Sequence, residues 1–348
     1  MSYVAQTGSG SAADVLQSGD RNYSDVQQTG GGAAINANNN ADVDQDGTLN
    51  KSFVNQTNRD NGSVVDQFGN RNKSHVVQSG IGANEGMVVQ NGNRNYVSQS
   101  QVNGVSGSDA NEALVNQGDR TNAQGLSNNL GLFVETDAIL TTQGGGVPAD
   151  GTNDNVAFQI QDGSGNSAES QQFSALNAPF AGYSKQMQTG NDNQALVVQN
   201  AFEETGTPNT NNAALQVQTG NDNIAGLVQS GSGHDAWMLQ DGDDKALAVQ
   251  SGVRNDLVTK QYEGANYMEI GQQGFENAVY AAQRGGQSFI GDQSGTHNVM
   301  EVLQVGPAGN LLETIDCDIP AEMLPNPLPT MQNLEIPDIT APGLCADC

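Results

Sequence analysis

A pattern of about eleven residues recurs along most of this chain. Residues 188–199 read QTGNDNQALVVQ, residues 218–229 read QTGNDNIAGLVQ, and residues 67–78 read QFGNRNKSHVVQ. Each unit starts with glutamine, tends to place glycine two and asparagine five positions later, and reaches the next glutamine through a short apolar alternation. So short a unit cannot enclose its own core. The repeat therefore predicts a stack of similar units that bury their apolar groups against one another.

Each unit predicts one β-strand and one tight arc. Every second residue after the asparagine is small or apolar, as in Asn72, Ser74, Val76 and Gln78. This period of two indicates a strand with one buried face. The glycine and its polar neighbours favour a turn with positive φ. Two units make a turn of about 22 residues, and successive turns pair in parallel about 4.8 Å apart. The predicted fold is all-β, a two-sheet parallel β-solenoid.

The chain divides into two regions. The repeat is predicted to span residues 1–310, and it is irregular and rich in insertions around 100–187. The weaker anchors of that stretch are Gln117, Gln143, Gln161 and Gln172. Residues 311–348 hold six of the ten prolines and all three cysteines. Because repeated proline is incompatible with central strands, this tail is predicted to be extended and polyproline-like.

The glutamines are predicted to form side-chain ladders inside the coil. A buried amide needs partners for both its oxygen and its nitrogen, and an identical amide one turn away supplies them. Such ladders work only if the residue recurs at a fixed period. One predicted column holds Gln218, Gln240, Gln261, Gln283 and Gln304, and the opposite one holds Gln229, Gln250, Gln272 and Gln293. The other predicted ladder residues are Gln56, Gln67, Gln78, Gln188, Gln199, Asn72, Asn193, Asn223, Asn255, Asn277 and Asn298. The predicted arc glycines are Gly69, Gly80, Gly190, Gly220, Gly231, Gly242, Gly252 and Gly295.

The motif resembles the curlin repeat, in which a serine precedes Gln-x-Gly-x-x-Asn-x-Ala and a further glutamine. Residues 74–80, SHVVQSG, carry one half of it, and residues 188–199 carry the other. The resemblance covers roughly residues 2–306. It implies a secreted β-solenoid subunit that polymerises into amyloid-like fibres of the bacterial extracellular matrix or cell surface, with itself and other matrix components as partners. The number of units, the insertions and the cysteine-containing tail keep a surface adhesin or attachment component as the alternative.

The first residues point to a polymerisation edge. Ser2, Val4 and Gln6 fit the inward phase of a strand, and no polar capping segment precedes them. An uncovered edge strand is a template for pairing. We therefore expect a second subunit to cover it, and head-to-tail contact of this kind builds open filaments. Residues 1–10 have neither a basic segment nor an apolar run, so no signal peptide is expected in this chain.

Two further features are candidate contacts. The outward positions Trp237, Val258 and Tyr280 form a candidate landing strip for the tail or for a neighbouring filament, the alternative being apolar residues of no consequence. Cys345 and Cys348 form a C-x-x-C motif, with Cys317 as the third thiol. In a secreted protein this favours a disulfide, although the sequence leaves open which pair forms. A zinc site would need a fourth ligand, and the tail contains no histidine.

Charge and motif content disfavour several functions. The net charge of −27 argues against nucleic acid and anionic membranes as partners. No run of 18 apolar residues is present, so membrane insertion is not expected. The histidines His75, His234 and His297 fall in different units, and none accompanies a nucleophile motif. We therefore expect neither an enzyme nor a cofactor.

Two weaker possibilities concern small ligands. Acidic turns such as DGDD concentrate oxygen ligands, so weak Ca²⁺ binding is plausible even though the nonapeptide of calcium β-rolls is absent. An ice-binding solenoid would need a flat, regular array of threonines. Here Thr or Ser occurs only once per unit, in the arc, at Thr189, Thr219, Ser230 and Ser251.

Overall fold

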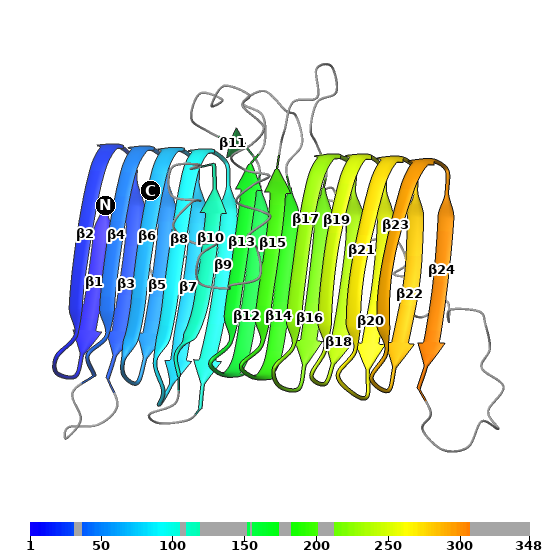
Figure 1. The fold of residues 1–348 in the computed structure, drawn as a ribbon. Coiled ribbons are helices and arrows are strands. Elements are labelled where there is room, and N and C mark those ends of the chain that lie inside the picture. The colour runs from blue at the N-terminus through cyan, green and yellow to red at the C-terminus, as the bar shows by residue number, and fades with distance from the viewer. Residues whose placement is uncertain are drawn as a thin grey trace, which may run out of the picture.

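The computed structural model describes residues 1–30, 37–104, 109–118, 152–153, 155–173, 182–200 and 212–306. Within these ranges the chain forms strands and turns and no helix. The strands build two parallel sheets, and the chain alternates between them as it coils (Figure 1). The predicted fold class, a two-sheet parallel β-solenoid, is confirmed.

The first sheet contains twelve strands. In spatial order they are β1 (Ser2–Thr7), β3 (Tyr23–Thr29), β5 (Lys51–Thr57), β7 (Lys73–Gly80), β9 (Tyr96–Asn103), β12 (Val156–Ser164), β14 (Tyr183–Asn191), β16 (Ala213–Thr219), β18 (Asp235–Asp241), β20 (Asp256–Tyr262), β22 (Ala278–Arg284) and β24 (Val299–Val305).

The second sheet has eleven strands in its continuous path. They are β2 (Ala12–Asp20), β4 (Asn40–Thr48), β6 (Asn61–Asn70), β8 (Asn84–Asn93), β10 (Asn111–Gln117), β13 (Ser167–Phe173), β15 (Gln194–Asn200), β17 (Ile224–Ser232), β19 (Lys245–Val253), β21 (Tyr267–Phe275) and β23 (Ser288–Thr296). The two-residue strand β11 (Thr152–Asn153) pairs beside this path with β8.

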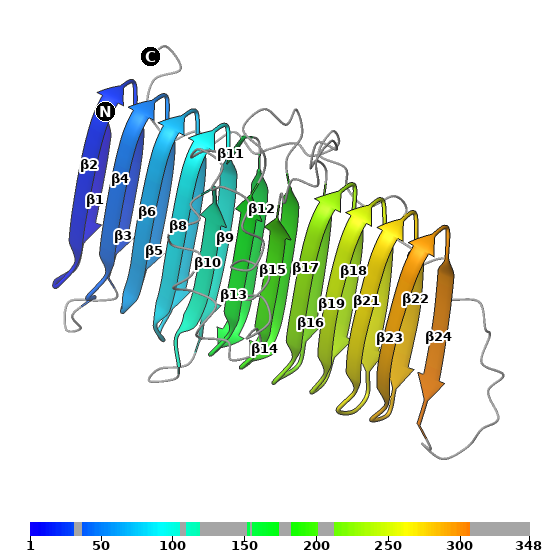
Figure 2. The same cartoon turned by 45° about the horizontal axis from the view of Figure 1, so that its top comes forward.

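The coil keeps its register across insertions of very different length. In the regular C-terminal part, equivalent glutamines are 21 or 22 residues apart. The same step takes 28 residues between Gln28 and Gln56, and 60 between Gln101 and Gln161. The strands on either side still pair glutamine with glutamine, so these longer steps do not shift the register of the stacked strands (Figure 2).

The core is a thin layer between the two sheets, filled by alternate residues of each strand. In the N-terminal turns it consists largely of fully buried valines, among them Val26, Val43 and Val54. In the C-terminal turns larger side chains such as Met238 and Ile270 replace them. A few apolar side chains per strand are enough, because the turns above and below close the space that a single turn leaves open.

The arcs require residues that accept positive φ. Gly69 has a φ of 105°, and Arg71, directly before the asparagine, has a φ of 59°. A Cβ atom at Gly69 would lie 2.1 Å from the carbonyl oxygen of Gly92 in the next turn. Glycine therefore recurs here because no side chain fits between stacked arcs. All eight glycines predicted for the arcs have positive φ.

Candidate assembly interface

A ladder of glutamines runs the whole length of the first sheet. Each side-chain nitrogen, Nε2, donates to the Oε1 of the glutamine one turn later, over 2.6–3.0 Å. The members are Gln6, Gln28, Gln56, Gln78, Gln101, Gln161, Gln188, Gln218, Gln240, Gln261, Gln283 and Gln304. The predicted column from Gln218 to Gln304 is therefore the C-terminal part of a continuous ladder.

The second sheet carries an equivalent ladder, with Nε2 to Oε1 distances of 2.6–3.5 Å. Its members are Gln17, Gln45, Gln67, Gln90, Gln117, Gln172, Gln199, Gln229, Gln250, Gln272 and Gln293. From Gln45 to Gln272, each amide also donates to a backbone carbonyl oxygen. For example, Gln229 Nε2 also donates to the carbonyl oxygens of Ala213 at 3.0 Å and His234 at 3.3 Å. The interior members of the ladder are therefore buried with their amide nitrogen and oxygen both paired.

The asparagines hold the arcs together from turn to turn. Asn72 accepts the backbone N–H of Asn95 through Oδ1 at 3.1 Å, and its Nδ2 donates to the carbonyl oxygens of Phe68 and Gly92, each at 3.0 Å. Oδ1 of Asn193, Asn223, Asn255 and Asn277 accepts the next turn's N–H in the same way. These side chains therefore supply hydrogen-bond partners to backbone N–H and C=O groups of the tight arcs.

Two other residue types take the asparagine position, and sequence reasoning did not place them there. His234 accepts the N–H of Asn255 through Nδ1 at 3.2 Å, while its Nε2 lies 3.0 Å from the carbonyl oxygen of Ser230. Burial lowers the pKa of His234 to about 4, so the ring is neutral and its Nε2 carries the donated proton. Asp244 accepts the N–H of Asn266 through Oδ1 at 3.0 Å. His234 follows Gln229 by five residues, the usual asparagine spacing, whereas Asp244 follows Gln240 by four, so spacing alone identifies only His234.

A third ladder occurs only in the middle of the coil and was also missed. Gln99, Gln159, Gln186 and Gln216 are buried and bonded Nε2 to Oε1 at 3.0 Å. They occupy the position that is valine in β7 and methionine in β18. Each amide also donates across the core to backbone carbonyl oxygens of the second sheet. The Q-x-Q pattern of these strands is the visible sequence signal.

The first turn presents an open strand edge. Ser2, Val4 and Gln6 are in register with the buried residues Ser24, Val26 and Gln28 of the next turn. Val4 is 44% exposed, whereas Val26 is fully buried. The difference arises because no described residue lies beyond β1. The inward-facing side chains of this edge are therefore core residues that lack one neighbour.

The last turn presents the opposite edge. Phe289 of β23 and Met300 of β24 are only partly buried, whereas their in-register neighbours Met268 and Val279 in the preceding turn are fully buried. Both ladders have a direction, since every donor points towards the C-terminal end. In the described structure Gln293 and Gln304 therefore end on unused Nε2 protons, and Gln6 begins with an unused Oε1. Donors at one end and acceptors at the other make the two ends complementary.

The three residues of the predicted landing strip are aligned on neighbouring strands. Trp237, Val258 and Tyr280 lie on neighbouring strands at the same level of β18, β20 and β22. Val258 is only 8% exposed, so it is buried rather than open. Leu215 extends the strip on one side, and Glu301 ends it on the other. The structure describes no residue of the tail that was predicted to contact this strip.

The histidines and acidic groups do not converge. His75 stacks against Phe53, with ring centroids 5.0 Å apart, and His297 pairs with Glu276 at 2.7 Å. Burial, with a smaller contribution from the charge of Asp256, raises the pKa of Asp235 to about 6. Within the described ranges, no group of three or more His, Cys, Asp or Glu side chains is placed to hold a metal. Nor does this part of the chain contain a helix able to cross a membrane.

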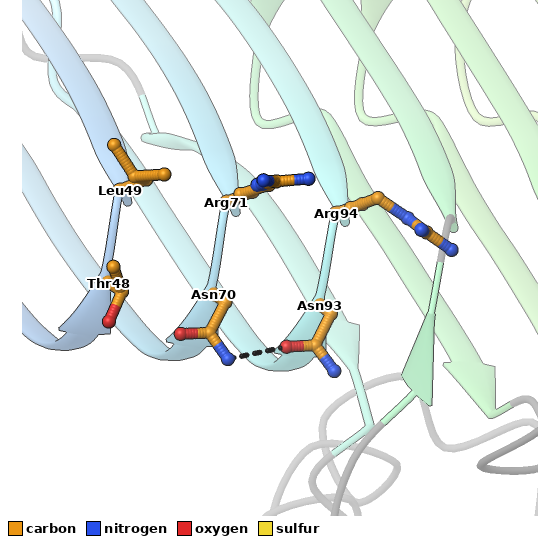
Figure 3. A pocket seen from close by; sticks show the side chains of 6 residues that line it. All are labelled: Thr48, Leu49, Asn70, Arg71, Asn93 and Arg94. Carbon is orange, nitrogen blue, oxygen red and sulfur yellow. Dashed lines mark hydrogen bonds between the residues drawn. The ribbon is translucent and has the colours of Figure 1, made fainter.

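The outer side of the N-terminal arcs carries a row of basic side chains. Arg71 and Arg94 project from successive arcs beside Leu49, and Asn70 Nδ2 donates to Asn93 Oδ1 at 2.9 Å (Figure 3). With Thr48 these residues line a shallow pocket. The arc position before each asparagine is thus a surface position where charge varies between turns.

The arc hydroxyls do not form a regular array. Thr189 aligns with Thr219, but the next position in that column is Asp241. Ser230 aligns with Ser251, which is followed by Gln273. The columns are therefore interrupted within a few turns.

Several predictions lie outside the described residues. These are the thiols Cys317, Cys345 and Cys348, the whole tail 311–348, and the anchor Gln143. No protein-family model matches the chain. A search of curated proteins likewise found no match.

Proposed function

We propose that this chain is a structural subunit that polymerises end to end into an extracellular, curli-like fibre of the bacterial surface or biofilm matrix. The observation that carries the proposal is the complementarity of the two coil ends. Unused glutamine donors lie at the last turn and an unused acceptor lies at the first, on ladders that already repeat this bond at every step.

The edges support the same contact. Val4 is exposed and Met300 is only partly buried, although their in-register neighbours Val26 and Val279 are fully buried. Adding a second copy would complete the backbone pairing of an edge strand and bury these side chains, as strand addition does in cross-β assemblies. Because the contact joins two different surfaces, it continues without closing.

The extracellular setting rests on the curlin-like motif of residues 74–80 and 188–199. The net charge of −27 disfavours nucleic acid as a partner. We expect the protein to act as a scaffold without catalytic activity or a required cofactor.

Electron microscopy of the purified chain, combined with sedimentation, tests the proposal. The wild type is expected to form long unbranched filaments that pellet. Val4→Lys places a charge at an inward-facing edge position that a second copy would bury, so it is expected to slow or abolish filament growth. Tyr3→Lys is the matched control, because Tyr3 is 45% exposed on the outer face of the same strand.

Equal growth of both variants would contradict assembly through this edge. A wild type that stays monomeric under all conditions would overturn the fibre proposal and favour the alternative of a surface binding protein.

A further inference from the structure

The continuous strand paths of the two sheets differ by one strand in the described structure. The continuous coil has twelve strands in the first sheet and eleven in the second, and both its first strand, β1, and its last, β24, belong to the first sheet. Within the described residues the coil therefore makes eleven and a half turns. A half-integral number of turns restricts how a second copy can continue the coil.

Stacking without rotation places β1 of the next copy on β24. The following strand, β2, would then lie two strand spacings, about 9.6 Å, from β23 of the first copy. One strand position in the second sheet would stay empty at every junction. The edges facing that gap would keep unpaired backbone groups that the rest of the coil satisfies.

Rotation by half a turn about the fibre axis removes this gap. Both sheets are built from the same unit of strand, glycine arc and asparagine, so either sheet can continue the other. In the rotated arrangement β1 follows β23, and β2 follows β24. We propose that successive copies of residues 1–348 join in this way, each turned by half a turn relative to the last, in addition to the coil's own accumulated twist. This inference rests on the proposed function.

The ladders meet correctly in the rotated junction. Gln293 Nε2 would donate to Gln6 Oε1 of the next copy, and Gln304 Nε2 would donate to Gln17 Oε1 of that copy. Both bonds keep the direction found at every internal step. Gln17 Oε1 also accepts from the amino group of Met1 at 3.1 Å, and a carbonyl oxygen has a second lone pair for the new bond.

The side chains favour the same pairing. Aligning Gln304 with Gln17 sets Val302-Leu303-Gln304 against the identical Val15-Leu16-Gln17. Identical residues stacked in register form continuous ladders. Leu16 is 63% exposed and Leu303 is 47% exposed, and the rotated junction covers both with each other. Without rotation, Leu303 would instead face Ala5, and Leu16 would lack a strand beside it.

Disulfide trapping distinguishes the two junctions. In full-length chains with Cys317, Cys345 and Cys348 replaced by Ser, one variant carries Leu303→Cys with Leu16→Cys. The other carries Leu303→Cys with Ala5→Cys. In-register neighbours on parallel strands lie about 4.8 Å apart, within the range that a disulfide spans. Filaments are grown under reducing conditions, inspected by electron microscopy, oxidised, and separated on a non-reducing gel.

The rotated junction predicts a ladder of covalent multimers for the Leu303/Leu16 variant and single-chain size for the Leu303/Ala5 variant. Filaments in which Leu303/Ala5 cross-links, or in which Leu303/Leu16 does not, would overturn the rotation and leave the fibre proposal standing. The absence of filaments from the cysteine-free parent chain would instead overturn the proposed function, and the rotation with it.

Discussion

The side-chain nitrogen of Gln229 donates to the amide oxygen of Gln250, 2.9 Å away and 21 residues later. The pair is fully buried, and each amide also donates to a backbone carbonyl oxygen in the strand or arc packed against it. One residue type therefore pairs its own copies and the backbone together. This dual role explains why glutamine, rather than an apolar residue, recurs at every half-turn.

Replacing Gln229, Gln250 and Gln272 together by leucine should destabilise the coil. The carbonyl oxygens that these amides serve would lose their partners, at a cost of about 1–3 kcal/mol for each buried group left unpaired. We expect a lower midpoint in thermal unfolding followed by circular dichroism, together with reduced filament yield. Gln273→Leu is the control, because Gln273 is exposed on the outer face of the same strand. Unchanged stability and yield in the triple variant would contradict the structural role of the ladder.

Gly69→Ala should be strongly destabilising. Gly69 has a φ of 105°, and an added Cβ would lie 2.1 Å from the carbonyl oxygen of Gly92. The backbone strain alone is about 1–3 kcal/mol, and the clash adds to it. Gly62→Ala is the matched control in the same strand, since a Cβ there meets nothing within 4 Å. We expect thermal unfolding to shift downwards for the first variant and to stay level or rise for the second. Equal shifts would show that stacked arcs do not require glycine.

His234 should make the coil less stable in acid. Its pKa is about 4 in the folded chain, below the ordinary 6.5. The unfolded chain therefore takes up a proton at a pH where the folded chain does not. The stability contribution of neutral His234 is complete above pH 6.5 and is lost as the pH falls towards 4. His234→Asn, which restores the usual arc residue, should reduce the fall in unfolding midpoint between pH 6.5 and 4.

Asp235, next to His234, should affect the pH dependence of stability in the opposite direction. Its pKa is raised to about 6 from 3.8, so the folded chain binds this proton more tightly than the unfolded chain does. Stability associated with Asp235 is present at low pH and is lost as the pH rises through 6. Compared with the wild type, Asp235→Asn should therefore have a higher unfolding midpoint at pH 7, and the gain should be smaller at pH 4. If the unfolding midpoints of both variants depended on pH as the wild type does, that result would contradict the pKa shifts that burial causes at His234 and Asp235.

Filament growth should accelerate when charge repulsion is reduced. Acidic residues stack in register, as Asp14 does with Asp42 and Asp235 with Asp256. Raising ionic strength from 0.1 M to 1 M shortens the screening length from about 10 Å to about 3 Å, which weakens repulsion between exposed charges. Growth rates followed by light scattering should increase with NaCl. CaCl₂ at matched ionic strength separates screening from weak Ca²⁺ binding, and a rate independent of all salts would contradict both.

The regular turns could be predicted from the sequence because local and global requirements coincide there. The step of 22 residues that places Gln218 beside Gln240 is consistent with the period of two that alternates buried and exposed residues along each strand. His234 and the ladder from Gln99 to Gln216 were harder to predict. In these cases a different side chain performs the same hydrogen-bonding task, or an interior position changes from apolar to polar for a few turns only. The burial of Val258 could not be predicted either. It lies at an outward position, and its exposure there depends on the neighbouring side chains, which the alternation along one strand does not specify.

The central claim is that this chain forms a fibre in which glutamine-laddered turns continue from one copy to the next. X-ray diffraction from aligned filaments of the purified protein tests it most directly. The account predicts a sharp meridional reflection at about 4.7–4.8 Å, because every strand lies across the fibre axis. Filaments that lack this reflection, or a protein that remains monomeric at all concentrations, would contradict it.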